Sequence, residues 1–318
     1  MMKQLYIIGA VALLFLVQGC GESDEEVIAP EYNSALLQRI RAAASVVPGP
    51  LPSTVSYVKY AESIRKWSDV IEGGSDDASK MARTSFQVSY PDGYIMIDAG
   101  MDREVHKFFE KDGSQPFDED KANTVRQALS TAKMILITHE HADHSAGIIR
   151  TAVTGGVPQK TLLTAEQAMN LQNNPHTPEI KLEPENRKQY IITSFESILP
   201  VAPGMVLIKA PGHTSGSIMI YTQLQNGREY IFTGDVSWTY QGIVEMKEKP
   251  SSERKRVGEN GDLVKKQLTW LNQLMTNERI TMVVSHDDIM MPQYVGMGLM
   301  SEGFQGLTGS STDSSAIR

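Results

Sequence analysis

Short apolar segments bounded by turn residues recur along the chain, and their lengths are typical of β-strands. Eight such segments lie at residues 86–90, 94–98, 134–138, 161–163, 205–210, 217–222, 230–233 and 281–285. The turn sequences Pro-Asp-Gly at 91–93 and Gln-Asn-Gly at 225–227 each separate two of these segments. Both turns favour a direct reversal of the chain, so they predict β-hairpins.

Apolar residues at three- and four-residue spacing predict helices over residues 32–45, 119–132 and 262–275, and another helix is predicted to begin at Ala165. Asp118 precedes the second of these helices and is a candidate N-cap. Strands that come in runs and are interrupted by helices indicate an α/β or α+β domain with mixed sheets.

The first nineteen residues are predicted to be a signal peptide. Lys3 precedes an apolar run from Leu5 to Val17, which is too short to span a bilayer comfortably. The run ends in Val-Gln-Gly-Cys at 17–20, which resembles a bacterial lipoprotein cleavage box. This resemblance implies cleavage before Cys20 and a lipid anchor on Cys20, in the bacterial cell envelope and facing the periplasm. The alternative is an ordinary signal peptide followed by an incidental cysteine.

The rest of the chain is predicted to form one domain with a flexible segment at each end. Residues 20–31 include the acidic stretch Gly-Glu-Ser-Asp-Glu-Glu and are expected to be a tether after the lipidated cysteine. Residues 32–305 form the domain, and the Ser-, Gly- and Thr-rich residues 306–318 are expected to be a flexible tail.

Charge and cysteine content narrow the classes of function. The 318-residue chain has a formal net charge of −8, which argues against a nucleic-acid partner because such a surface needs an excess of basic residues. Its single cysteine excludes an intramolecular disulfide and a zinc site built from several thiolates.

Three of the seven histidines fall within six residues, in the sequence Thr-His-Glu-His-Ala-Asp-His at 138–144. In an extended segment, His139 and His141 point the same way and can share one metal ion. Asp143 and His144 come where the chain turns into a helix, so they suit a second metal nearby. Imidazole nitrogen together with carboxylate oxygen suits zinc.

Three later segments place a ligand-type residue at the end of an apolar strand. His213 follows the strand at 205–210, Asp235 follows the strand at 230–233, and His286 follows the strand at 281–285. Strand ends are rigid positions, which a metal site requires of its ligands. Each residue alone is weak evidence, but together with the histidine cluster they predict a metal centre.

The motif His139-x-His141-x-Asp143-His144, followed by Gly212-His213, Gly234-Asp235 and His286, resembles the metallo-β-lactamase-fold superfamily of hydrolases. The resemblance covers roughly residues 86–286 and implies a four-layer αββα sandwich with a two-metal site. It also implies the ligands: His139, His141 and His213 for one metal, Asp143, His144 and His286 for the other, and Asp235 as the bridge. Asp98 in Asp-Ala-Gly matches an early motif of the superfamily and is expected to support the site rather than bind metal.

The resemblance implies a hydrolase with two zinc ions and a small-molecule substrate. The ions share a bridging hydroxide that attacks the substrate, and Asp143 is the expected catalytic residue that orients the hydroxide and carries a proton. Iron, manganese and cobalt occupy similar nitrogen and carboxylate sites. The oligomeric state stays open.

The sequence restricts the class of substrate less than it restricts the metal site. The lack of a cysteine ligand excludes the cysteine-dependent β-lactamases, and the spacing from His213 through Asp235 to His286 resembles that of lactonases. Lactonases usually have a tyrosine shortly after the bridging aspartate, whereas this chain has Trp238 there and Tyr240 two residues later. Both are candidate substrate-binding residues, with hydrophobic lining as the alternative.

The expected reaction is hydrolysis of a lactone or another ester-like bond. Three enzymatic alternatives remain within the same fold: β-lactamase, thioesterase and phosphoester hydrolase. A non-enzymatic metal-binding lipoprotein of the envelope is the alternative from another class.

Overall fold

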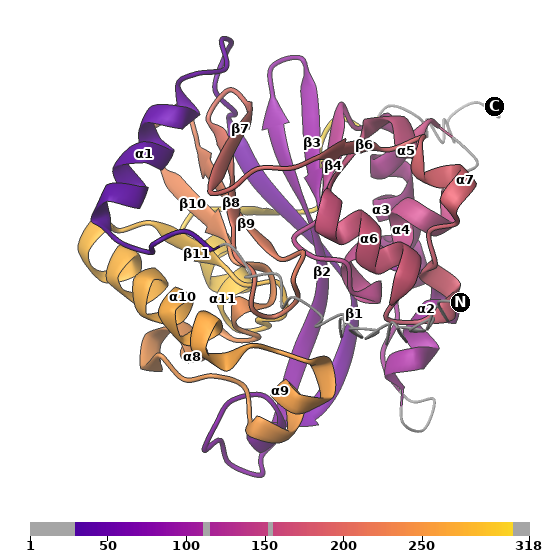
Figure 1. Ribbon diagram of the computed structural model, residues 1–318, viewed down its shortest axis with the longest axis vertical. Helices are drawn as coiled ribbons and strands as arrows, with labels where there is room; N and C mark the ends of the chain where they lie inside the picture. The colour runs from indigo at the N-terminus through magenta and orange to yellow at the C-terminus, as the bar shows by residue number, and fades with distance from the viewer. Residues whose placement is uncertain (1–28, 111–114, 152–154, 308–318) are drawn as a thin grey trace, which may run out of the picture.

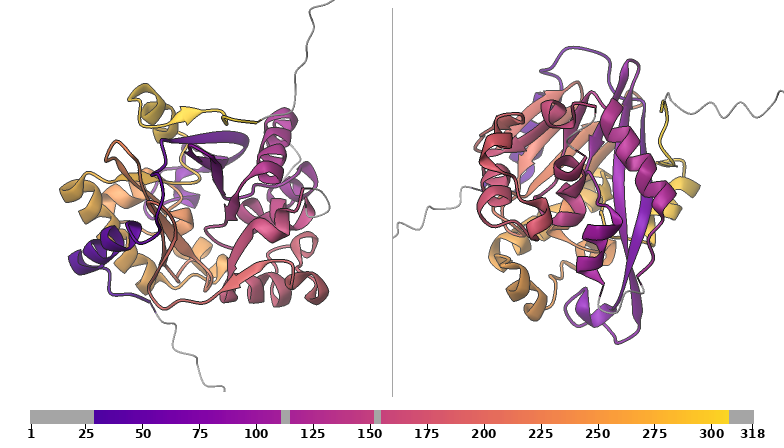
Figure 2. Two further views of the ribbon diagram at one scale, coloured as in Figure 1. Left: turned by 90° about the horizontal axis from the view of Figure 1, so that it is seen from above. Right: turned by 90° about the vertical axis from the view of Figure 1, so that its right-hand side faces the viewer.

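The computed structural model describes residues 29–110, 115–151 and 155–307. Two β-sheets lie face to face, and helices cover the outer side of each sheet (Figures 1 and 2). This arrangement is the predicted αββα sandwich, so the fold class is confirmed. The predicted signal peptide, Cys20, the first part of the tether and residues 308–318 lie outside the described residues.

The larger sheet has seven strands in the order β12-β1-β2-β3-β4-β5-β6. They are β1 (Thr54–Lys66), β2 (Ala78–Tyr90), β3 (Gly93–Ile97), β4 (Met134–Leu136), β5 (Thr161–Thr164), β6 (Ile191–Thr193) and β12 (Ser301–Glu302). β1 and β2 form a long antiparallel hairpin in which Ala61 faces Arg83, and a β-bulge interrupts the pairing at Tyr60. Such bulges redirect a side chain, and this one lies beside the histidine cluster.

The smaller sheet has five strands in the order β11-β10-β9-β8-β7. They are β7 (Ile198–Ala202), β8 (Met205–Lys209), β9 (Ile218–Gln223), β10 (Glu229–Phe232) and β11 (Thr281–Val283). β9 pairs antiparallel with both β8 and β10, and β10 pairs parallel with β11. The strands β8, β10 and β11 therefore run in the same direction and end at the same edge of the sheet.

Two helices, α1 (Ser34–Ala44) and α10 (Gly261–Gln273), pack on the smaller sheet. Three helices pack on the larger sheet: α3 (Glu119–Thr131), α4 (Ala142–Arg150) and α6 (Ala165–Asn173). The predicted cap is confirmed, because the Asp118 side chain accepts a hydrogen bond from the Lys121 amide. The shorter helices are α2 (Arg103–His106), α5 (Val157–Lys160), α7 (Pro184–Arg187), α8 (Tyr240–Glu245), α9 (Ser251–Val257) and α11 (Met290–Gly296).

Three apolar layers hold the sandwich together. One lies between the two sheets, where the rings of Phe86 and Phe232 pack edge to face with centroids 5.3 Å apart. The other two lie between each sheet and its helices, around Leu129 and Trp270 respectively. Buried apolar area supplies most of the folding free energy, so these layers fix the strand ends that carry the functional side chains.

The long hairpin is the main element that the sequence pattern did not predict. The predicted strand at 86–90 extends back to Ala78, and β1 was not predicted at all. Polar residues such as Ser56 and Arg83 are buried in this hairpin, which breaks the alternation that marks a strand.

Among the described residues, no helix has the length and apolarity needed to span a membrane. The domain limits at residues 32 and 305 stay predictions.

Candidate metal centre

Seven histidine and aspartate side chains meet where the strands of both sheets end. His213, Asp235 and His286 follow the parallel strands β8, β10 and β11. The loop after β4 carries His139 and His141, and Asp143 and His144 lie in the first turn of α4. All the residues that the sequence predicted as metal ligands are thus brought together in two groups, although residues 139–141 form a bend rather than an extended strand.

The first ligand group consists of His139, His141, His213 and Asp235, whose donor atoms all lie within 4.8 Å of one another. His213 Nε2 is 3.0 Å from His141 Nδ1 and 3.4 Å from Asp235 Oδ2. His139 Nε2 is 3.8 Å from the same oxygen. Three imidazole nitrogens and one carboxylate oxygen therefore surround one point, in the number and type that zinc prefers.

The second ligand group consists of Asp143, His144 and His286. The Nε2 atoms of the two histidines are 3.3 Å apart, and Asp143 Oδ2 lies 3.5 Å from His144 Nε2 and 3.4 Å from His286 Nε2. The other oxygen of Asp235, Oδ1, is 3.4 Å from His144 Nε2 and 3.1 Å from His286 Nε2. Asp235 therefore directs one oxygen to each group.

The donor atoms fit divalent metal ions. Within the described part of the chain, the buried His139 Nε2 and Asp235 Oδ1 atoms make no hydrogen bond. A buried polar atom without a partner costs free energy, and an ion between the donors would satisfy it. Shared binding of an ion would also explain why imidazole nitrogens lie so close together, as His213 Nε2 and His141 Nδ1 do at 3.0 Å.

In the first ligand group, burial also sets the protonation that metal binding requires. It lowers the pKa of His141 to about 3 and holds the pKa values of His139 and His213 well below the ordinary value. Burial disfavours the ionised form of Asp235, but the surrounding imidazoles outweigh it and keep its pKa well below the usual range. The first ligand group is thus made of neutral imidazoles and one carboxylate.

Hydrogen bonds behind the histidines turn their Nε2 atoms toward the centre. His144 donates from Nδ1 to Asp98 Oδ2 at 2.8 Å, His286 from Nδ1 to the Ala82 carbonyl at 2.8 Å, and His213 from Nδ1 to Glu259 Oε2 at 2.8 Å. Such outer partners fix the tautomer and orientation of a ligand. Asp98 therefore supports the site, as its place in the sequence motif implied.

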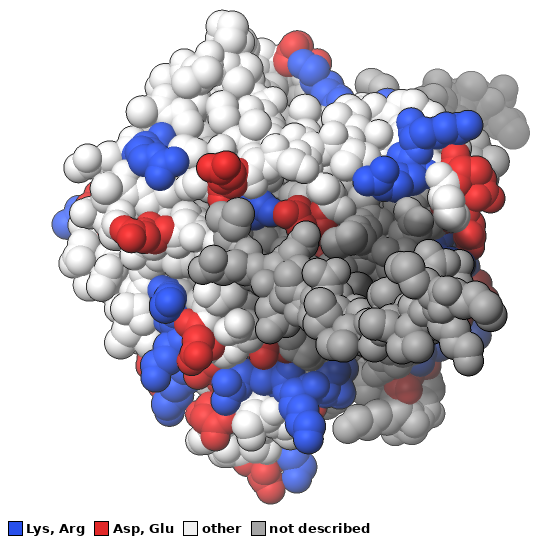
Figure 3. Space-filling view, viewed as in Figure 1, with Lys and Arg blue, Asp and Glu red and all other residues white. Residues whose placement is uncertain are grey.

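Lys249 and Glu259 form a buried ion pair behind the first ligand group, with Lys249 Nζ 2.7 Å from Glu259 Oε2. Lys249 also donates to the Asp235 carbonyl at 2.6 Å. In the basic run 247–256, residues 251–257 form α9, where Lys and Arg side chains gather on the surface (Figure 3), whereas Lys249 is buried. No sequence motif marked either Lys249 or Glu259.

Two more residues at the centre had no signal in the sequence. Arg83, on β2, forms an ion pair with Asp143 Oδ2. Burial disfavours ionisation of Asp143, but Arg83 and the neighbouring imidazoles hold its pKa well below the usual range. His176 packs against His141 with ring centroids 4.2 Å apart.

Trp238 and Tyr240, the predicted substrate-binding residues, have different surroundings. Trp238 is buried, and its Nε1 donates to Asp235 Oδ2 at 2.7 Å, so it orients the carboxylate between the ligand groups. Tyr240 is partly exposed and lines a cavity.

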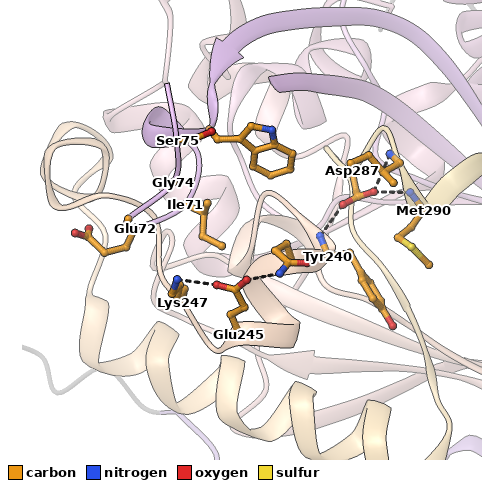
Figure 4. Close-up of a pocket in the computed structure, with 13 residues that line it drawn as sticks. Ile71, Glu72, Gly74, Ser75, Tyr240, Glu245, Lys247, Asp287 and Met290 are labelled. Carbon is orange, nitrogen blue, oxygen red and sulfur yellow. Dashed lines mark hydrogen bonds and ion pairs between the residues drawn. The ribbon is translucent and has the colours of Figure 1, made fainter. Parts of the chain in front are cut away.

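This cavity has a volume of about 440 Å³ and lies between the end of the β1–β2 hairpin and the loop after His286 (Figure 4). Its lining combines apolar side chains, Trp67 and Ile71 from the hairpin and Ile289 and Met290 after His286, with polar and charged ones that include Glu72, Glu245 and Lys247. Asp287, which follows His286 in the chain, lines this cavity and accepts hydrogen bonds from the amides of Tyr240 and Met290, whereas none of the seven candidate ligands lines it.

Solved structures with the same fold include several hydrolases. An N-acyl homoserine lactone hydrolase with N-hexanoyl-L-homoserine at its catalytic metal centre matches with a TM-score of 0.61 and 14% identity, over 76% of this chain and 96% of its own. The dizinc quorum-quenching lactonase AidC matches with a TM-score of 0.53 and 13% identity, over 74% and 87%. A probable metal-dependent hydrolase from Staphylococcus aureus matches with a TM-score of 0.59 and 12% identity, over 76% and 91%.

Sequence identities of 12–14% to these solved structures establish only that the fold is shared. A separate search of curated proteins finds no match. The family profile of the metallo-beta-lactamase superfamily, however, matches residues 82–290, which is more than half of the chain and contains all seven predicted ligands. This match confirms the resemblance seen in the sequence and the hydrolase class that it implied. The chain belongs to the metallo-beta-lactamase superfamily.

Proposed function

We propose that the chain is a dinuclear zinc-dependent hydrolase that cleaves a lactone or another ester-like bond with an activated water. The observation that carries this proposal is the position of Asp235, which directs Oδ2 to the first ligand group and Oδ1 to the second. Two zinc ions bound there would lower the pKa of a shared water molecule and polarise the substrate carbonyl.

Different residues of the chain would bind the metal ions, orient the attacking water and orient the shared carboxylate. His139, His141 and His213 would hold one metal ion, and His144, His286 and Asp143 would hold the other, with Asp235 available to both. Asp143 also orients the attacking water and carries its proton to the leaving group. Trp238 keeps the Asp235 carboxylate oriented with one oxygen toward each ligand group through the 2.7 Å hydrogen bond from Nε1.

A lactone with an acyl chain suits the surroundings of the centre. The cavity that Asp287 lines has the size of a small-molecule site and combines apolar side chains with charged ones such as Glu245 and Lys247. Tyr240 lines this cavity and is our candidate for the contact with the substrate. Two of the structural neighbours are lactonases, and one of them holds an acyl homoserine product at its metal centre.

Proton release at constant pH tests the reaction. The zinc-loaded full chain is assayed with an acyl lactone, an acyl thioester, a phosphotriester and a β-lactam, each of which releases acid on hydrolysis near neutral pH. Preference for the lactone supports the proposal. Preference for another substrate replaces the substrate assignment, and no turnover with two metals bound favours a non-enzymatic metal-binding role.

The role of Asp143 is tested in the same assay. We expect Asp143→Asn to lower turnover by ~10²–10⁴-fold while the protein stays folded and keeps at least one metal ion. Asp288→Asn is the matched control, because Asp288 pairs with Lys59 outside the centre. Undiminished turnover in the metal-loaded Asp143→Asn protein would contradict the mechanism.

We also propose that the mature protein is anchored to the membrane by lipid on Cys20, on the periplasmic side of a bacterial envelope. The lipoprotein-like sequence at residues 17–20 supports this, and Cys20 is the only cysteine in the chain. Several acyl chains on one residue give stable anchoring, which a single chain does not. Cys20→Ser is expected to move the protein from the membrane fraction to the soluble fraction, and unchanged membrane association would contradict the anchor.

A further inference from the structure

The two ligand groups differ in the positive charge next to them. Arg83 is 4% exposed, and its Nη1 contacts Asp143 Oδ2, the same oxygen that faces His144 Nε2 and His286 Nε2. The same Nη1 lies 3.4 Å from both ring nitrogens of His286. A guanidinium is always protonated in proteins, so this cation is a permanent part of the second ligand group.

Several contacts hold Arg83 in this position. Its Nη2 donates to Ser63 Oγ at 3.0 Å, and its Cζ lies 4.5 Å from the centre of the Phe109 ring. On the neighbouring residue, the Ala82 amide donates to the His286 carbonyl at 3.0 Å and the Ala82 carbonyl accepts from His286 Nδ1 at 2.8 Å. The strand that carries Arg83 is thus joined to the loop that carries His286, so the two side chains keep their relative placement.

The bulge in β1 adds to this arrangement. Tyr60 lies at the bulge, and its hydroxyl donates to the Asp143 carbonyl at 3.1 Å. Both strands of the hairpin therefore contact Asp143, one at the backbone and the other at the carboxylate. Within the described residues, Arg83 Nε makes no hydrogen bond, so the guanidinium directs its donors chiefly to Asp143 and Ser63.

The first ligand group has no such contact in the described part of the chain. Its nearby cation, Lys249, pairs with Glu259 and donates to the backbone carbonyl of Asp235, not to a ligand oxygen. The second group has a compensating anion in Asp98, which lies behind His144. Asp98 contacts the far nitrogen of that imidazole, whereas Arg83 contacts the ligand oxygen itself, so the guanidinium is the closer charge.

We propose that Arg83 is a positioning residue that makes metal loading sequential, with a tight first step at His139, His141 and His213 and a weaker second step at the group that it contacts. A divalent ion entering the second group meets the repulsion of the guanidinium. It must also share Asp143 Oδ2 with the guanidinium. Arg83 at the same time fixes Asp143 in the orientation that catalysis needs. This inference rests on the proposed metal centre.

Stepwise metal binding to the full apo-protein tests the inference by calorimetry and by the visible absorption of Co²⁺. The wild type is expected to show one tight step and a second step at least ~10-fold weaker. Arg83→Gln, which removes the charge, is expected to tighten the second step by ~10-fold or more and leave the first unchanged. Arg83→Lys, which keeps the charge, is expected to leave the second step weak.

The control is Lys80→Gln, which removes a positive charge from the same strand at an exposed side chain and should leave both steps unchanged. Circular dichroism of each apo-protein checks that it is folded. A second step that is equally weak or weaker in Arg83→Gln would overturn the inference, as would two equal steps in the wild type. Both outcomes leave the metal centre itself intact, whereas the absence of metal binding in the wild type would overturn the centre and the inference together.

Discussion

The two ligand groups use the same kinds of donor atom but have different surroundings. Behind the first group, the positive charge of Lys249 is balanced by Glu259, which in turn orients His213. In the second group, the positive charge of Arg83 contacts the ligand oxygen of Asp143 directly. We therefore expect residues from distant segments of the chain, and not the ligands alone, to set how strongly each group binds metal, because they set the local charge.

The largest effect is expected from a substitution of Asp235, the residue that directs one oxygen to each ligand group. Asp235→Asn keeps the shape of the side chain but removes the negative charge shared by both groups. We expect kcat/KM to fall by ~10³-fold or more, because a two-metal site needs a ligand that serves both ions. Steady-state kinetics and metal analysis check this result. Two metals and near-normal activity in this variant would show that the groups do not depend on Asp235.

An intermediate effect is expected when only the first group is disturbed. Glu259→Gln weakens the orientation of His213 and leaves Lys249 buried without its charged partner. We expect the affinity of the first binding step to fall by ~10–100-fold, the usual cost of losing such an outer partner. Calorimetric titration measures it, with Glu248→Gln as the control, since Glu248 pairs with Arg254. An unchanged first step would mean that Glu259 does not tune the metal.

The smallest expected effect concerns the orientation of the bridge. Trp238→Phe removes the Nε1 donor to Asp235 Oδ2 and keeps an aromatic ring. One hydrogen bond is worth about 1 kcal/mol, so we expect kcat/KM to fall by about fivefold. Trp270→Phe is the matched control, because its Nε1 donates to the Asn33 carbonyl instead. Equal losses in both variants would indicate a general packing effect.

The sequence predicted the ligands well because they carry local signals. His139, His141, Asp143 and His144 lie within six residues, and His213, Asp235 and His286 each follow an apolar strand. The core strands and main helices were predicted for the same reason, since the strands are short apolar runs and each helix has one apolar face. These signals are local in the chain, so they do not require knowledge of the tertiary structure.

The residues that surround the ligands could not be predicted in this way. Arg83 reaches Asp143 across 60 positions of sequence, and Lys249 lies in a run of basic residues that carries no recognisable motif. Their roles depend on how the hairpin and the segment before α9 pack against the centre. Charged residues in a strand also weakened the pattern that would have revealed the hairpin. The sequence therefore predicted the metal ligands but not the charges that distinguish the two groups.

The most direct test of the metal centre is a crystal structure of the zinc-loaded protein with anomalous diffraction data collected at the zinc absorption edge. We expect two anomalous peaks about 3.5–4 Å apart. One would lie among His139, His141 and His213, the other at His144 and His286, and Asp235 would bridge them. A single peak in fully loaded crystals, or two peaks without Asp235 between them, would contradict it.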